Sequence, residues 1–166
     1  ETVVTDHHEP STTMPNAVAV VDPKRHDCDY PFKQLAGVGV AYKLAQGLLL
    51  RLGIDASILE NYIELVAIGT SADIVPLVDE NRVFVNSGLA ILNNSENVGL
   101  KALMKAAGLS GREIGTGQIV FIIAPRINAV GRMGDAQRAV KLLTTEDEVE
   151  ATQIAAILEK ENQHRK

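Results

Sequence analysis

Two short runs of β-branched and apolar residues near the N-terminus predict β-strands. The first covers residues 2–5 and leads into Asp6, and the turn Glu9-Pro10-Ser11 follows soon after. The second covers residues 16–21 and runs into Asp22-Pro23-Lys24. A continuous apolar run of this kind is typical of a buried strand in a parallel sheet, followed by its exit turn.

The rest of the chain carries apolar residues at helical spacing, interrupted by glycines and polar turns. A long helix is predicted to end at Gly53, and Gly108 is predicted to cap another. Residues 69–73 are predicted to break a helix, whereas residues 116–123 fit either a helix or a strand. The predicted helices cover residues 35–52, 58–68, 79–94, 98–107, 135–143 and 146–165.

This order of elements predicts an α/β fold, with a partial parallel sheet flanked by helices and a long final helix. Two strands make a poor sheet for so many helices, and the chain is therefore interpreted as part of a larger domain. Both ends fall inside predicted elements. We expect residues 1–145 to be the C-terminal part of a domain and residues 146–166 to begin a helix that connects to a second lobe.

Composition and charge narrow the class of protein. Apolar residues make up 46% of the 166 residues, which supports a real core and argues against disorder. The single cysteine, Cys28, excludes an internal disulfide, and the sequence shows no signal peptide and no membrane-spanning run, so we expect a cytoplasmic protein. The net charge of −5 argues against a general nucleic-acid-binding surface but suits a site whose carboxylates hold metal ions.

The candidate chemistry is concentrated in Asp6-His7-His8, at the predicted end of the first strand, where open α/β sheets carry their ligands. One carboxylate and two imidazoles suit a divalent ion such as Mn²⁺. A surface loop that happens to hold two histidines is the alternative for this triplet alone. Gly37 and Gly39, at the start of the first long helix, are interpreted as close-packing positions, with a role beside a phosphate as the alternative.

Four segments carry a resemblance to a known family. They are VTDHHE at residues 4–9, VDPKR at 21–25 with YPFKQLAGVGVA at 30–41, GTSADIVPL at 69–77, and PRINAVGRMGDA at 125–136. Taken in order, they resemble the DHH phosphoesterase superfamily and, within it, the RecJ single-strand-specific DNA exonucleases. The DHH triplet is common to the superfamily, whereas the last two segments indicate RecJ. The resemblance covers essentially the whole chain.

The resemblance implies a phosphodiesterase that uses two Mn²⁺ or Mg²⁺ ions and removes nucleotides from the 5′ end of single-stranded DNA in repair and recombination. It implies that His7 is a metal ligand and that His8 faces the scissile phosphate, while Asp6 orients the histidines. It also implies that Asp73 binds metal, for which capping of the next turn is the alternative.

Arg126, Asn128 and Arg132 match the family's contacts to phosphate and substrate. Guanidinium groups suit phosphate oxygens, and the Asn amide offers both a donor and an acceptor. Salt bridges to acids such as Glu113 or Asp135 are the alternative use of the two arginines.

The family's aspartates that precede the DHH triplet have no counterpart in this chain. We therefore expect the chain by itself to hold part of one metal site, to be inactive, and to self-associate through an exposed sheet edge. The implied partners are single-stranded DNA and a single-strand-binding protein or helicase, in the bacterial cytoplasm. Two other functions stay open: a DHH-family pyrophosphatase or oligonucleotide or cyclic-dinucleotide phosphodiesterase, and a non-catalytic binding domain with the DHH fold.

Overall fold

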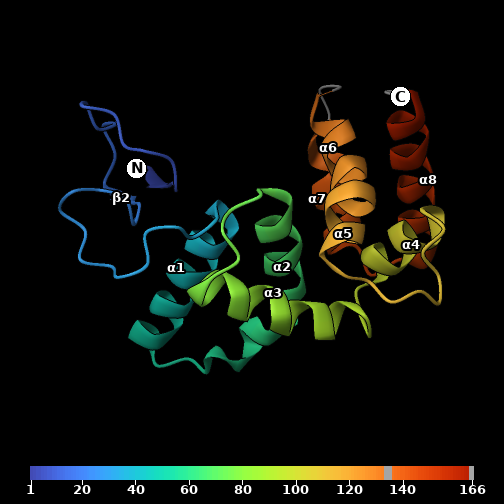
Figure 1. Cartoon of the computed structure of the whole chain (residues 1–166), viewed down its shortest axis with the longest axis horizontal. Coiled ribbons are helices and arrows are strands. Elements are labelled where there is room, and N and C mark those ends of the chain that lie inside the picture. Colours follow the sequence, from blue (N-terminus) through green and yellow to red (C-terminus); the bar gives the residue numbers. More distant parts are fainter. Residues whose placement is uncertain (133–135, 165–166) are drawn as a thin grey trace. The chain divides into compact units, whose positions relative to one another are not determined.

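A computed structural model describes residues 1–132 and 136–164, apart from the side chains of residues 130–132. It divides into two compact units, Glu1–Gly88 and Leu89–Lys166 (Figure 1). The elements that begin in the first unit are β1 (Val3–Thr5), β2 (Ala19–Val21), α1 (Gly37–Leu52), the 3₁₀ helix η1 (Ala56–Tyr62), α2 (Ile63–Ala72) and α3 (Asp79–Leu92). Those of the second unit are α4 (Val98–Ala106), α5 (Thr116–Gln118), the π-helix η2 (Ile119–Ile123), α6 (Ala124–Arg132), α7 (Ala136–Thr144) and α8 (Glu148–His164).

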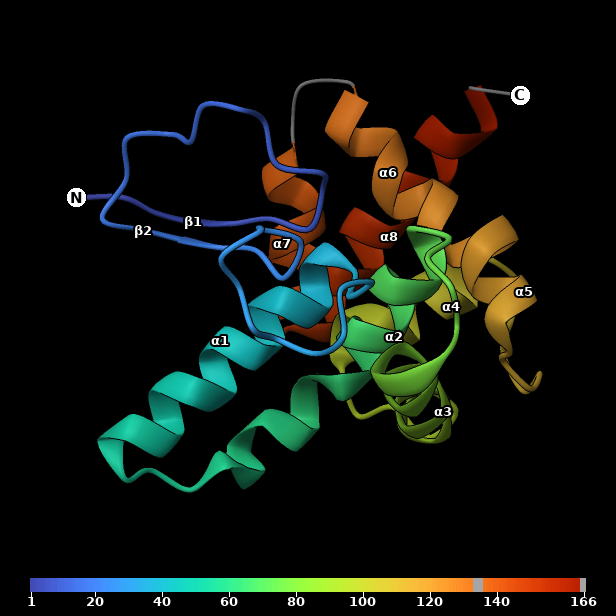
Figure 2. The same cartoon turned by 60° about the vertical axis from the view of Figure 1, so that its left-hand side comes forward.

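The two strands of the first unit form a parallel pair in which Val4 lies opposite Val20 (Figure 2). The main-chain hydrogen bonds continue past the strands, because Asp6 N donates to Val21 O over 3.0 Å. The predicted α/β class and the parallel strands are confirmed. Parallel pairing brings the residues that follow both strands, including the DHH triplet, to the same edge of the sheet.

The predicted burial of the second strand is wrong. Val18 and Ala19 are exposed, and Val20 and Val21 are only partly buried. The reason is that the sheet of the described residues has two strands. Of these, β1 is the strand that contacts α1. An apolar run is buried on both faces only where helices cover both faces of a sheet.

The ends of the long helices follow the predicted glycine signals. Gly53 has φ of +67°, a left-handed conformation that glycine adopts without a Cβ clash, and Ile54 N donates to Leu49 O over 2.9 Å. This arrangement ends α1 at the predicted residue. Residues 116–123 are helical as α5 and η2, so the strand alternative for this segment is excluded.

The prediction that residues 69–73 break a helix is wrong, since α2 continues through them to Ala72. A Cβ at Gly69 would lie only 2.8 Å from the Val38 Cγ1 atom of α1. Glycine here allows two helices to approach closely, and it does not end one. The helix predicted over residues 58–68 is also divided, as a 3₁₀ turn up to Tyr62 and an α-helix from Ile63.

The core of the first unit joins the loop after β2 to α1, α2 and α3. Its buried residues are Leu35, Val40, Tyr42, Val66 and Phe84. A polar network fixes the same loop: Tyr30 Oη donates to Glu80 Oε2 over 2.6 Å, and Lys43 Nζ lies 2.5 Å from Glu80 Oε1. Burial and the Glu80 carboxylate together raise the pKa of Tyr30, so its hydroxyl stays protonated as the donor.

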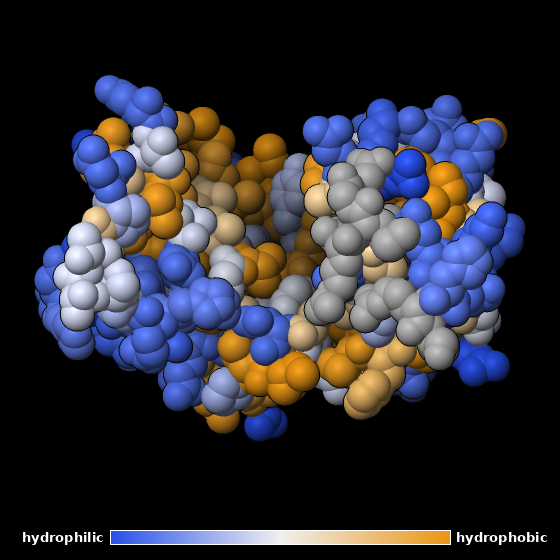
Figure 3. Space-filling model, turned by 90° about the horizontal axis from the view of Figure 1, so that it is seen from above, coloured by the Kyte–Doolittle hydropathy of each residue, from blue (hydrophilic) through white to orange (hydrophobic). Residues whose placement is uncertain are grey.

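The second unit is a helical assembly in which α4 and α6 both contact α8 (Figure 1). Its fully buried large apolar residues are Leu92, Leu100, Leu103, Ile119, Ile123, Leu142 and Leu158. On the face shown in Figure 3, apolar residues are interspersed with polar ones, in agreement with the apolar residues that are exposed to solvent. In the described part of the chain, no helix combines the length and the apolar character needed to cross a membrane.

Candidate active site

The structure brings together the two predicted metal ligands, His7 and Asp73. His7 is the second residue after β1, and Asp73 is the residue that follows α2. The His7 Nε2 atom lies 3.5 Å from Asp73 Oδ2. This separation is long for a hydrogen bond. Two ligands that are each about 2.1 Å from one divalent cation lie roughly 3.0–3.5 Å apart, so the pair fits a shared ion.

Gly37 provides the space that His7 occupies. A Cβ at Gly37 would lie 3.2 Å from His7 Cδ2 and 3.6 Å from His7 Nε2, so the imidazole lies directly on the first residue of α1. The first turn of α1 has no acidic residue and no side-chain cap. The first turn of α1 therefore supplies no carboxylate to offset the partial positive charge at this end of the helix, which lies beside the His7 ring.

Asp6 organises the triplet by accepting three hydrogen bonds. Its Oδ1 atom accepts from His7 N (2.7 Å), His8 N (3.2 Å) and the His8 ring at Nδ1 (2.8 Å). The His8 ring hydrogen bond, followed by the two main-chain bonds, lowers the pKa of Asp6 from 3.8 to about 2. An ionised carboxylate only accepts, so the shared proton is on His8 Nδ1.

The hydrogen bond to Asp6 uses Nδ1 of His8 and leaves Nε2, the second ring nitrogen, for other partners. The His8 side chain is 76% exposed, and its Nε2 atom is the free ring nitrogen. Because the pKa of Asp6 is depressed, its hydrogen bonds favour the folded state above about pH 4, and this contribution is lost as the pH falls towards 2. The hydrogen bond between Asp6 Oδ1 and His8 Nδ1 fits the orienting role predicted for Asp6, which stays a prediction.

The described residues supply only part of a metal site. A nitrogen and a carboxylate oxygen are a donor set that suits Mn²⁺ or Mg²⁺. Within residues 1–132 and 136–164, no group of three or more His, Cys, Asp or Glu side chains converges to hold a metal ion. His7 and Asp73 fit as two candidate ligands of one cation.

The three residues predicted to contact phosphate belong to α6, in the second unit. Arg126 is buried, its Nε forms an ion pair with Glu159, and its Nη1 donates to Ile122 O over 2.6 Å. Arg126 therefore forms a salt bridge, which is the predicted alternative to a phosphate contact. Asn128 is exposed, and the side chain of Arg132 lies outside the described residues. Phosphate contact stays a prediction for all three.

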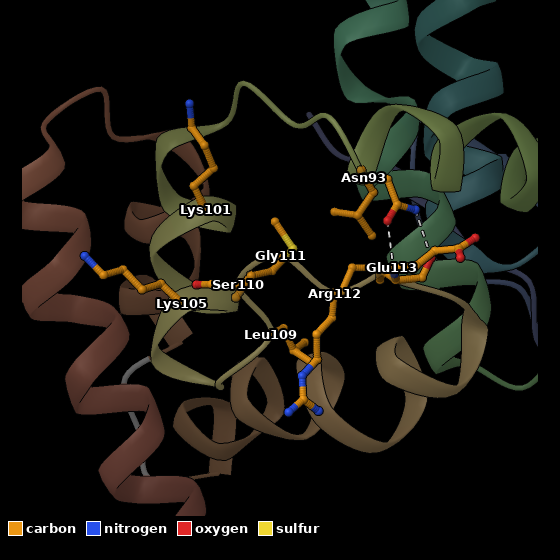
Figure 4. A pocket seen from close by; sticks show the side chains of 11 residues that line it. Asn93, Lys101, Lys105, Leu109, Ser110, Gly111, Arg112 and Glu113 are labelled. Carbon is orange, nitrogen blue, oxygen red and sulfur yellow. Dashed lines mark hydrogen bonds between the residues drawn. The ribbon is translucent and has the colours of Figure 1, made fainter.

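A large pocket in the second unit, beside α4, does not form a phosphate-binding site. Its volume is about 530 Å³. Asn93 closes one side, since Ile114 N donates to Asn93 Oδ1 over 2.8 Å. The side chains of Lys101, Lys105 and Arg112 extend away from one another in Figure 4, so they form no convergent anion site.

One feature of the site has a signal in the sequence that the predictions missed, and another has none. An Asp that accepts from the main-chain N–H two residues later is a common turn pattern, and Asp6-x-His8 fits it. Gly37 was interpreted as a packing position, but the sequence did not show that its packing partner is His7.

Gly37→Ala is expected to weaken Mn²⁺ binding by about tenfold in the full-length protein, because the new methyl group displaces the His7 ring by a few tenths of an ångström. Gly47→Ala is the matched control, since Gly47 is in the same helix and a Cβ added there would have nothing within 4 Å. The measurement is a calorimetric or spectroscopic Mn²⁺ titration. Equal affinities of the two variants would show that Gly37 does not position His7.

Comparison with known proteins gives the context of this geometry. Residues 1–70 match the DHH family, N-terminal domain. The single-stranded-DNA-specific exonuclease RecJ of Bacillus subtilis is 45% identical over 165 residues, which are 99% of this chain and 20% of that protein. RecJ of Thermus thermophilus is 39% identical over 99% of this chain and 24% of its own length.

Solved structures agree with the sequence comparison. The crystal structure of Thermus thermophilus RecJ in complex with Mn²⁺ matches 98% of this chain and 24% of its own, with a TM-score of 0.82 and 38% identity. A structure of the same protein with Mg²⁺ matches with a TM-score of 0.80. The chain thus spans less than a third of the length of these relatives. Residues 1–70 are thus similar to the DHH family, N-terminal domain, and nearly the whole chain is similar to a segment of RecJ.

Proposed function

We propose that this chain supplies part of the metal and phosphate site of an exonuclease that hydrolyses single-stranded DNA from its 5′ end. The observation that carries the proposal is the convergence of His7 Nε2 and Asp73 Oδ2 to 3.5 Å, next to an exposed His8. RecJ relatives are named for activity on single-stranded DNA, and their structures are solved with Mn²⁺ and Mg²⁺. Both facts support the same chemistry here.

His7 and Asp73 would hold one cation, together with ligands from the rest of the protein. A bound divalent ion supplies activation of the attacking water and neutralisation of phosphate charge. In the hydrolysis, water adds to phosphorus, one P–O bond breaks, and the departing oxygen takes up a proton. The uncapped positive end of α1 beside His7 favours an anion such as the substrate phosphate.

His8 would act directly on the scissile phosphate. Asp6 holds its Nδ1 atom, so Nε2 is the ring nitrogen that faces the substrate. As an imidazolium it donates a hydrogen bond to a phosphate oxygen or a proton to the leaving oxygen. The ionised Asp6 accepts the hydrogen bond from Nδ1 and so holds the ring in this orientation.

Asp6→Asn is expected to lower kcat on single-stranded DNA by about 10- to 100-fold, because the amide can keep the main-chain hydrogen bonds but loses the charge that orients His8. Asp27→Asn is the matched control: this carboxylate is also bonded to a neighbouring side chain, that of Arg25, in the loop after β2. Steady-state kinetics of the full-length variants give the result. A wild-type kcat for Asp6→Asn would remove Asp6 from the mechanism.

The family resemblance supports further parts of the proposal. On this ground we propose that the protein acts in DNA repair and recombination in the bacterial cytoplasm, with a single-strand-binding protein or helicase as its protein partner.

The function is tested with the full-length protein and four substrates: a 5′-labelled single strand, the same sequence as a blunt duplex, a dinucleotide and pyrophosphate. We expect Mn²⁺-dependent release of nucleotides from the single strand, abolished by a chelator. Hydrolysis of the dinucleotide or pyrophosphate alone would assign the protein to the other DHH enzymes. No metal-dependent hydrolysis of any substrate would support a binding domain instead.

A further inference from the structure

Ile74 combines an unusual main-chain conformation with an exposed side chain, directly beside the candidate metal ligand Asp73. Its φ is +59°, in the left-handed region, although isoleucine is β-branched. Its side chain is 79% exposed. The conformation ends α2 at Asp73, so the same turn that presents the carboxylate to His7 also presents Ile74 to solvent.

Stability of the described fold does not account for this residue. A left-handed conformation is costly for a β-branched residue, and glycine or asparagine adopts it more readily. An apolar side chain offsets such a cost when it is buried, but Ile74 is not. Strained residues of this kind cluster at functional sites, where a ligand contact gives a reason for them.

Ile74 is part of a larger apolar surface in the loop between α2 and α3. Leu77 is 40% exposed and Val78 is 52% exposed. We call Ile74, Leu77 and Val78 the apolar loop. Consecutive Cα atoms are about 3.8 Å apart, so the loop begins one residue from the metal-binding carboxylate. Any strand whose phosphate lies at His7 and Asp73 therefore brings its nearest nucleotides close to this loop.

We propose that the apolar loop, which begins at Ile74, is the surface on which an unpaired base of the substrate packs next to the scissile phosphate. This inference rests on the proposed exonuclease function. An unpaired base has an apolar face that gains from contact with a side chain. In a duplex both faces are covered by neighbouring bases, so the contact favours single strands.

The test is a double-mutant cycle between Ile74 and the base. The full-length protein and its Ile74→Asn variant are titrated with a single strand, in Ca²⁺ to prevent cleavage, and with the same strand lacking its three 5′-terminal bases. We expect Ile74→Asn to weaken binding of the intact strand about fivefold and to leave binding of the abasic strand almost unchanged. Asparagine suits the left-handed conformation, so the melting temperature is expected to stay equal or rise.

Leu50→Asn is the matched control, because Leu50 is 80% exposed on α1 and lies outside the apolar loop. It is expected to bind both strands as the wild type does. Equal losses on both strands for Ile74→Asn would overturn the inference. So would a lower melting temperature with unchanged binding, which would show that another part of the protein covers Ile74. Failure of the exonuclease proposal is recognised separately, as absence of Mn²⁺-dependent cleavage by the wild type.

Discussion

Asp73→Asn in the full-length protein is expected to lower kcat/KM on single-stranded DNA by at least about a hundredfold, which corresponds to roughly 3 kcal/mol. The substitution keeps the size of the side chain but removes the negative charge that faces His7 Nε2 across 3.5 Å. Mn²⁺ affinity, measured by titration, is expected to fall with activity, because hard divalent cations depend on charged oxygen ligands.

If Asp73 instead caps a helical turn, its loss is expected to affect stability and not metal binding. A lost cap lowers the stability of a protein by about 1 kcal/mol and has no effect on metal binding. Asp73→Ala tests that role, because asparagine caps a helix as well as aspartate does and alanine does not. Asp55→Ala is the control, since Asp55 caps η1 by accepting from Ser57 N over 3.0 Å. Asp73→Ala with normal Mn²⁺ affinity and a lower melting temperature would assign Asp73 to capping and contradict the metal role.

Gly99→Ala is expected to destabilise the second unit by about 3 kcal/mol or more. A Cβ at Gly99, in α4, would lie 1.7 Å from the main-chain oxygen of Leu142 in α7, so the two helices would have to move apart. Main-chain atoms of a helix cannot turn away as a flexible side chain does, and overpacking of this kind is among the severe mechanisms of destabilisation.

Amide hydrogen exchange measures this effect locally, even if the full-length protein does not unfold in one step. Protection of the α4 and α7 amides is expected to fall in Gly99→Ala. The control is Gly117→Ala in α5, where nothing lies within 4 Å of the added Cβ, and protection is expected to stay equal or rise. Unchanged protection in Gly99→Ala would mean that α4 and α7 do not approach as closely as the structure shows.

The helices were predictable because their signals are local. Apolar spacing and a glycine in the left-handed conformation at Gly53 act within a few residues, and α1 ends where they indicate. Gly69 shows where this reasoning fails. A glycine that ends a helix and a glycine that lets another helix approach look the same in a sequence, and only the position of Val38 distinguishes them.

The sequence nominated residues for the candidate site, but their geometry was not predictable. Resemblance nominated His7 and Asp73, and the fold brings them together through the end of α2. No local pattern indicates that Gly37 packs against the His7 ring or that Glu159 forms an ion pair with Arg126. Nor does one indicate that the main chain of Ile74 has a left-handed conformation. Each of these depends on contacts or main-chain angles set by the tertiary structure.

An anomalous-diffraction map of the full-length protein crystallised with Mn²⁺ would show directly whether His7 and Asp73 share a metal ion. We expect a manganese peak within bonding distance, about 2.0–2.3 Å, of both His7 Nε2 and an Asp73 carboxylate oxygen. Manganese bound elsewhere in the protein, with His7 and Asp73 in contact only with each other, would contradict the assignment of this pair as metal ligands.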